Sequence, residues 1–420
     1  MEQSRISRRG VLGLTGGLAV AGVAGVAGAG LLDGGRVTAG NAGAKVTAAP
    51  VKRFAHPGLL HTSADFKRMR TKVRAGAAPW KAGWKVLADN RHSQSGWKPN
   101  PQATVYRGGG SPQNYVVLYN DVHAAYQNAL RWKVTGERAH GDTARDILNA
   151  WSATLKTVAG SADRFLAAGI YGYQFANAAE LMRGYPGFDL ARFQKMMREV
   201  FYPMNDDFLK HHNGALITNY WANWDLTAMC SVLAIGILCD DRAKVQQAVT
   251  YFKTGAGNGS IRHAVPFLHP GGLGQWQEAG RDQGHATLGI GLMGTFCEMA
   301  WNQGYDLYGY DGNRFLKGAE YVAKYNLGHD VPFTPYVWKS GVAGTHGRTV
   351  TQTEVSPSAR GIVRPIWALV YNHYVRRRGL HAPYTKAMAA KVRPEGGGGN
   401  YGPNSGGFDQ LGFGTLAFTR

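Results

Sequence analysis

Residues 220–238 read YWANWDLTAMCSVLAIGIL, and this stretch decides the fold class. After Asp225 it carries no charged residue, and its apolar residues suit a helix in apolar surroundings. Other runs with helical spacing flank it, joined by short polar or glycine-containing connections. They cover residues 62–73, 116–134, 143–158, 167–182, 190–200, 243–252, 287–301, 318–325 and 362–375. Strand-like alternation is scarce, so we predict a mainly α protein.

Helical hairpins repeated over more than 300 residues, without the fixed period of a solenoid, favour an α/α toroid. Such an incomplete barrel buries one helix layer inside another and leaves a central groove. We predict one catalytic domain over residues 50–420. The glycine-rich tail from Glu395 to Arg420 is a candidate for a short strand that seals the ring. The cysteines Cys230, Cys239 and Cys297 lie in apolar helical runs and are expected to be buried thiols.

The first 32 residues have the pattern of a twin-arginine export signal. Arg8 and Arg9 precede a weakly hydrophobic stretch rich in glycine and alanine, and residues 27–29, Ala-Gly-Ala, suit a cleavage site. Residues 33–49 are small and polar, which predicts a disordered linker. We therefore expect a secreted protein that has no membrane association after the signal is cleaved.

The chain is strongly basic, with a formal net charge of +20. Residues 1–48 hold five Lys/Arg and two Asp/Glu, so their removal leaves +17. A field of this sign attracts polyanions. Because the chain shows no nucleic-acid-binding motif, we expect an anionic polysaccharide as partner and no nucleic acid. We also expect a monomeric protein.

Amides and aromatics concentrate in residues 218–225, TNYWANWD. Asn219 and Asn223 are four residues apart, so in a helix that starts near Thr218 they would share a face and donate to one carboxylate. Trp221 and Trp224 would project elsewhere and stack on sugars. The alternative is that Asn219 caps the helix and Asn223 satisfies a backbone group.

A second polar segment covers residues 277–285, QEAGRDQGH. Arg281 and His285 repeat the four-residue spacing, and Glu278 is placed to orient the guanidinium. Arg281 could then bind a substrate carboxylate, with the imidazole of His285 beside the carbon that loses a proton. The alternative is an ion-pair ladder on a solvated helix face.

Together the two segments fit one reaction, β-elimination in a polyuronate. Removing the proton α to a uronate carboxylate requires that amide, Arg or His contacts neutralise the carboxylate. A histidine or tyrosine takes the proton, and a tyrosine can return one to the leaving oxygen. We expect no metal or cofactor, because the sequence has no Cys/His cluster with zinc spacing and side chains can neutralise the charge.

At these residues the sequence resembles the alginate lyase superfamily of helical-toroid polysaccharide lyases. The resemblance is carried by residues 219–224, 280–285 and 371–374 and spans roughly residues 57–420. It implies a lyase acting on a 1,4-linked polyuronate such as alginate or glucuronan, with Asn and Arg neutralising the carboxylate and His and Tyr as base and acid. Better-known members carry an Asn-His pair just before Tyr-Trp, where this chain has Ile217-Thr218 or Thr218-Asn219. His285 then inherits the role of the base.

The spacing of the residues does not identify which tyrosine takes part in proton transfer. Tyr336 lies in a loop-like stretch, residues 332–340, that could cover the cavity, and Tyr171 and Tyr173 lie near Gln174 and Asn177. Each could instead be a packed core or sugar-stacking residue. Arg348 is a further candidate for substrate binding.

Two other functions remain open at this level. An inverting glycoside hydrolase on the same fold would use a carboxylate pair drawn from Asp225, Glu278, Asp282 and Glu354. A non-catalytic protein that binds acidic polysaccharide would use the tryptophans alone. The basic charge and the placement of Arg beside His favour the lyase.

Overall fold

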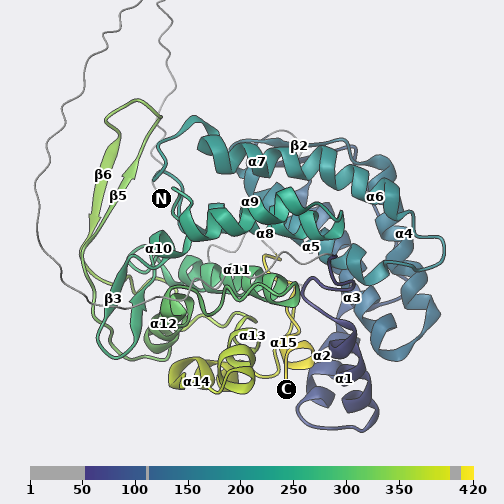
Figure 1. Cartoon of the computed structure of the whole chain (residues 1–420). Coiled ribbons are helices and arrows are strands. Elements are labelled where there is room, and N and C mark those ends of the chain that lie inside the picture. Colours follow the sequence, from purple (N-terminus) through teal and green to yellow (C-terminus); the bar gives the residue numbers. More distant parts are fainter. Residues whose placement is uncertain (1–52, 110–112, 398–407) are drawn as a thin grey trace, which may run out of the picture. The chain divides into compact units, whose positions relative to one another are not determined.

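The inner layer of the fold is a row of helices in which each packs on the next (Figure 1). The structure is a computed structural model and describes residues 53–109, 113–397 and 408–420. α5, α8 and α11 are buried along almost their whole length, as the apolar stretch at residues 220–238 predicted. The inner helices are α3 (Tyr115–Thr135), α5 (Asp163–Met182), α8 (Ala222–Leu238), α11 (Gln283–Asn302) and α13 (Trp367–Tyr371).

An outer layer covers this row, and four of its described helices each form a hairpin with an inner neighbour. α4 packs on α3, α9 on α8, α12 on α11 and α14 on α13. The predicted α/α toroid is therefore confirmed. The outer helices are α1 (Ser63–Arg74), α2 (Trp80–Asp89), α4 (Arg138–Thr154), α6 (Leu190–Met196), α7 (Tyr202–His211), α9 (Arg242–Thr254), α10 (Ile261–Ala264), α12 (Tyr310–Asn326) and α14 (Pro383–Lys391).

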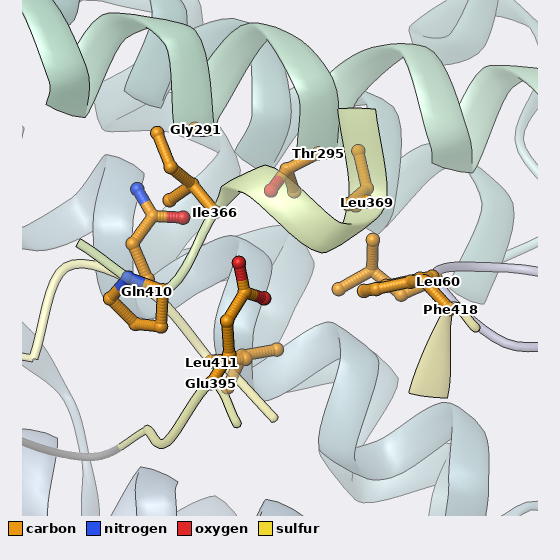
Figure 2. A pocket seen from close by; sticks show the side chains of 11 residues that line it. Leu60, Gly291, Thr295, Ile366, Leu369, Glu395, Gln410, Leu411 and Phe418 are labelled. Carbon is orange, nitrogen blue, oxygen red and sulfur yellow. The ribbon is translucent and has the colours of Figure 1, made fainter. Parts of the chain in front are cut away.

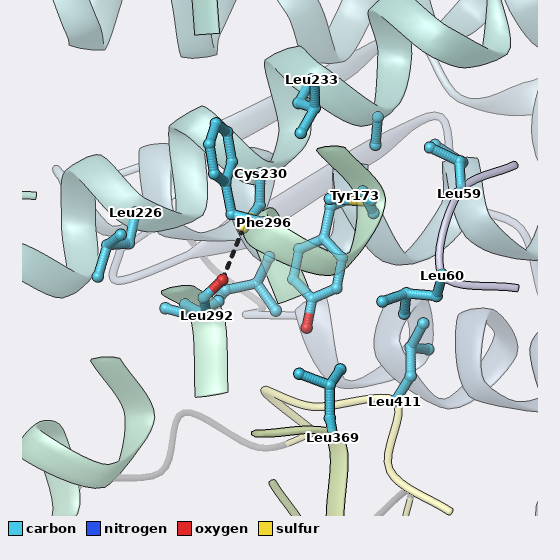
Figure 3. Close-up of a cluster of buried hydrophobic side chains, with 14 of the residues drawn as sticks. Leu59, Leu60, Tyr173, Leu226, Cys230, Leu233, Leu292, Phe296, Leu369 and Leu411 are labelled. Carbon is cyan, nitrogen blue, oxygen red and sulfur yellow. Dashed lines mark hydrogen bonds between the residues drawn. The ribbon is translucent and has the colours of Figure 1, made fainter. Parts of the chain in front are cut away.

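Small residues let the inner helices α5 and α8 approach closely. A Cβ on Gly169 of α5 would lie 2.6 Å from Thr227 Oγ1, and Gly172 faces Ser231 in the same way. On its other side α8 meets α11, where the thiol of Cys230 donates to the carbonyl of Leu292 at 3.3 Å (Figure 3). This packing fixes the relative positions of the three helix starts that form the site described below.

The C-terminal tail closes the row, but as a helix. α15 (Gly414–Ala417) packs on α13 and on α1 and α2, so it joins the last inner helix to the first elements of the domain. Among residues 395–397 and 408–420 the structure has no strand, so the described part of the tail does not contain the predicted sealing strand. The buried carboxylate of Glu395 supports this closure by accepting from the backbone N–H groups of Trp367 and Ala368 at 2.8 Å each. Figure 2 shows Glu395 beside Gln410 and Leu411 of the tail.

Short strands decorate the helices. β1 (Thr104–Arg107) pairs in parallel with β2 (Thr157–Gly160), and β3 (Phe267–His269) pairs with β4 (Leu273–Gln275). β5 (Tyr336–Ser340) and β6 (Arg348–Gln352) form an antiparallel hairpin beside the helices (Figure 1). The expected loop at residues 332–340 is therefore largely a strand.

Several predicted helix ends are confirmed by their caps. Thr62 and Asp65 form a capping box at the start of α1, and Gly136 ends α3 in the left-handed conformation. Cys230 and Cys297 are buried as expected, and Cys239 is half-buried. The described residues all belong to one compact unit. The predicted signal and linker, residues 1–32 and 33–49, lie outside the described residues. Within the described part of the chain, no helix is both long and apolar enough to cross a bilayer.

Candidate active site

A cavity of about 290 Å³ opens where the inner helices begin. Its wall includes the first residue of α3 and residues from the first turns of α5, α8 and α11. Helix N-termini carry partial positive charge, so the backbone itself favours an anionic ligand here. The lining residues are Arg107, Gln113, Tyr115, Asp163, Leu166, Ile170, Asn223, His285, Leu288 and Asp409.

Asn223 reaches the cavity from α8 and is held from behind by Glu278. Its Nδ2 donates to Glu278 Oε1 at 2.6 Å, and its backbone N–H donates to Glu278 Oε2 at 3.3 Å. Glu278 is fully buried, and burial raises the pKa of its carboxyl, although the nearby Arg281 acts in the opposite direction. The amide carries a second N–H beyond the one given to Glu278, so one donor is left for a ligand.

His285 reaches the cavity from α11 and is oriented by Asp282. Asp282 caps α11 by accepting from the backbone N–H of His285 at 2.7 Å through Oδ1, and its Oδ2 lies 2.7 Å from Nδ1 of the same histidine. Burial opposes ionisation of Asp282, but the hydrogen bonds from His285 outweigh it and hold the pKa of the carboxyl below its usual value. Nδ1 therefore carries the proton, and Nε2 is the nitrogen left to accept one.

Arg281 connects the two polar segments. Its Nη1 donates to Glu278 Oε1 at 3.0 Å, as predicted, and its guanidinium lies over the ring of Trp221 at 5.0 Å from the centroid. Trp221 in turn stacks on Trp338 of β5, with centroids 4.8 Å apart. Arg281 thus holds Glu278 and Trp221 together, and it is not among the residues that line the cavity.

Two expected helix faces are wrong. α8 begins at Ala222 with Trp221 as its N-cap, so Asn219 precedes the helix and does not share a face with Asn223. The Oδ1 of Asn219 instead accepts from the backbone N–H of Gly341 at 2.9 Å. In the same way α11 begins at Gln283, which leaves Arg281 outside the helix that carries His285. In both cases a cap replaces the first helical turn that the spacing suggested.

The expected tyrosines and the other binding residues are spread around the site. Tyr336 accepts from Gln277 Nε2 at 3.0 Å, and Gln277 also accepts from the backbone of Ala222, next to Asn223. Burial raises the pKa of Tyr336. Tyr173 is fully buried and donates to the carbonyl of Asp409. Tyr171 is also fully buried, and its ring faces the guanidinium of Arg107.

The remaining candidates lie away from the cavity wall. Trp224 packs against Phe208 and Tyr220, with centroids 5.8 and 4.5 Å away, and Arg348 is exposed on β6. Neither is among the lining residues. Trp224 is half-buried, so it contributes to the packing of α8 against α7.

Sequence reasoning missed Arg107 and Tyr115. Arg107 is the last residue of β1, and Tyr115 is the first residue of α3. The guanidinium of Arg107 lies 5.2 Å from the centroid of the Tyr115 ring. The local signal was the stretch 104–110, in which Thr-Val-Tyr-Arg is followed by glycines. This strand is too short to be recognised by an alternation of apolar and polar residues.

Most carboxylates that a hydrolase would use are buried and hydrogen-bonded to other groups of the protein. Asp225 is fully buried and bonded to His212, Tyr251 and the backbone N–H of Gly259. Glu354 is exposed. Among the described residues, no group of three or more His, Cys, Asp or Glu side chains is arranged to hold a metal ion.

The α/α toroid, with Asn223 and His285 on one cavity at its helix starts, fits a polysaccharide lyase of the helical-toroid class. A family model described as Alginate lyase matches residues 77–331, more than half of the chain. The chain belongs to the alginate lyase family. A search of curated proteins found no match.

Solved structures share the fold at low sequence identity. Alginate lyase A1-III from Sphingomonas species A1 has a TM-score of 0.54 at 14% identity, over 87% of this chain and 98% of that one. A variant of A1-III complexed with a tetrasaccharide gives a TM-score of 0.56 at 13% identity, over 87% and 97%. A second variant complexed with a tetrasaccharide gives 0.55 at 14% identity, over 85% and 94%. At these identities the likeness shows the fold alone.

Proposed function

We propose that the protein cleaves a 1,4-linked polyuronate, alginate or glucuronan, by β-elimination. The observation that carries the proposal is that Asn223 and His285 line one cavity, with His285 oriented by Asp282. Membership of the alginate lyase family supports this reaction. So does the binding of a tetrasaccharide by variants of A1-III with the same fold.

Neutralisation of the substrate carboxylate comes first. The N–H of Asn223 that Glu278 does not use donates to the carboxylate of the uronate to be cleaved. The N-termini of α8 and α11 add partial positive charge at the same place. Arg281 acts from behind, since its contact with Glu278 fixes the acceptor that orients the amide.

Proton transfer and bond cleavage follow. His285 Nε2 takes the proton from C5, the electron pair of that C–H bond forms the C4=C5 double bond, and the C4–O bond breaks. The leaving oxygen receives a proton from a tyrosine. Tyr115 is the tyrosine on the cavity wall, and Tyr336, held by Gln277, is the alternative.

The test is ultraviolet absorbance of the newly conjugated uronate during incubation with mannuronate blocks, guluronate blocks, glucuronan and hyaluronan. A rise on alginate or glucuronan that disappears in His285→Ala supports the proposal and names the polymer. New reducing ends without absorbance would overturn it in favour of hydrolysis, and tight binding without either signal would favour a non-catalytic binding protein.

A further inference from the structure

The guanidinium of Arg107 is buried in the cavity wall without an anionic partner. Arg107 is only 8% exposed, and its Nη1 has no hydrogen-bond partner among the described residues. Among the same residues, no carboxylate forms an ion pair with it. Aromatic rings flank it, with centroids at 5.2 Å for Tyr115 and 5.9 Å for Tyr171.

Burying a cation in this way is costly unless an anion completes the site. The aromatic faces compensate only in part. Two carboxylates line the same cavity, but Asp409 pairs with Arg364 at 2.9 Å and Asp163 makes no ion pair with Arg107. The charge of Arg107 is therefore available for a ligand.

The backbone around Arg107 holds the side chain in place. Arg107 is in register with Gly160 of β2, and a Cβ at Gly160 would collide with the carbonyl of Arg107. Gly160 has φ = 123°, a conformation that favours glycine. The strand pair thus brings Arg107 to the cavity as a fixed element, which suits selective binding.

Arg107 reaches the cavity wall from other elements than Asn223 and His285 do. Its strand β1 contacts α3 and α5, whereas the other two residues begin α8 and α11, further along the row of inner helices. The cavity is thus lined by anion-binding donors from two different sets of elements. A polyuronate presents one carboxylate on each sugar, so it can contact both sets.

We infer that Arg107 binds the carboxylate of a second uronate, on a sugar next to the one that His285 deprotonates. This inference rests on the proposed function and adds that the site selects for consecutive acidic sugars. A guanidinium binds a carboxylate through two parallel hydrogen bonds, which a single amide cannot do. Arg107 then contributes to binding and register, and abstraction of the proton stays with His285.

The test compares Arg107→Gln and Arg107→Lys with the control Arg74→Gln, which removes the same charge from an exposed position on α1. We expect Arg107→Gln to raise KM for alginate oligosaccharides by about ten- to hundredfold, with kcat changed far less. Arg107→Lys should recover part of the loss, and Arg74→Gln should show none. The melting temperature of free Arg107→Gln should not fall, because the variant removes an uncompensated buried charge.

Calorimetric binding of an alginate tetrasaccharide, in an inactive His285→Ala background, separates this inference from the proposed function. Arg107→Gln should weaken binding of the acidic tetrasaccharide, but not of one whose carboxylates have been reduced to alcohols. Equal affinity for the acidic tetrasaccharide with and without Arg107 would overturn the inference, even if the protein is a lyase. A lower melting temperature together with unchanged affinity would also overturn it, since Arg107 would then be structural. If the wild type shows no elimination on any polymer, the same comparison still decides whether Arg107 binds a carboxylate.

Discussion

Asp282 contacts His285 through both of its carboxylate oxygens, one on the backbone N–H and one on the imidazole Nδ1, each at 2.7 Å. A single side chain therefore starts α11 and sets the tautomer of the histidine. The base and its helix are positioned together, so a change in the one residue affects both.

Asp282→Asn separates these two tasks. The amide oxygen can still cap α11, but the amide NH₂ cannot accept a proton from Nδ1, so the histidine loses the tautomer that leaves Nε2 as the base. We expect kcat to fall by about a hundredfold or more. Asp189→Asn is the matched control, because Asp189 caps α6 by accepting from the backbone N–H of Arg192. Steady-state kinetics and thermal unfolding measure both variants. Equal kcat values for Asp282→Asn and the wild type would show that Asp282 has no role beyond capping.

Asn223→Ala and Asn219→Ala test which amide serves the reaction. Asn223→Ala removes the donor on the cavity wall and leaves Glu278 with one fewer partner, so we expect kcat/KM to fall by about a hundredfold. The free energy of unfolding should fall by about 1–3 kcal/mol. Asn219→Ala removes a contact to Gly341 of the β5–β6 connection and should change kcat/KM less than about threefold. Initial rates and urea unfolding measure both variants. A larger fall in kcat/KM for Asn219→Ala than for Asn223→Ala would contradict the proposed site.

Tyr115→Phe and Tyr336→Phe identify the proton donor. Tyr115 lines the cavity, whereas the hydroxyl of Tyr336 accepts from Gln277. We expect Tyr115→Phe to lower kcat by about a hundredfold or more, and Tyr336→Phe to have a smaller effect. The comparison uses the rate of double-bond formation at saturating substrate. The reverse order would assign the role to Tyr336.

Glu395 should make stability depend on pH. Burial raises the pKa of its carboxyl from 4.5 to about 7, even though backbone N–H groups of Trp367 and Ala368 donate to it. The folded protein therefore favours the protonated form, and this contribution is complete below about pH 4.5. It is lost as the pH rises through 7, by about 3 kcal/mol in total. Glu395→Gln should remove this dependence between pH 5 and 8.

Urea unfolding of Glu395→Gln across this pH range provides the measurement. Glu199→Gln, which changes an exposed carboxylate, is the control and should follow the wild type. A Glu395→Gln curve parallel to the wild-type curve would contradict the assignment of the pH dependence to Glu395.

The export signal can be tested on the full chain. We expect the double variant Arg8→Lys with Arg9→Lys to accumulate inside the cell, because the twin-arginine route reads the arginine pair itself. Lyase activity or immunodetection in medium and cell extract reports the outcome. Undiminished release of the double variant would rule out this route.

Much of the fold could be predicted because helical periodicity is a local property. The apolar run at residues 220–238 became α8. Thr62 begins α1 and Gly136 ends α3, where the sequence indicated. The same reasoning failed at Asn219 and Arg281, where a cap at Trp221 or Asp282 begins the helix after the predicted residue. Four-residue spacing predicts a shared face only inside a helix, and spacing alone does not give the first residue.

The sequence by itself determined the helical class, the two polar segments and a charge suited to an acidic polymer. The tertiary structure decided which of these residues meet. Gly169 lets α5 approach Thr227 of α8, and that packing sets the helix starts that bring Asn223 and His285 to one cavity. It also decided that Arg107, from a four-residue strand, lies in the same wall. Such convergence depends on contacts between residues far apart in the chain, and no local pattern records those contacts.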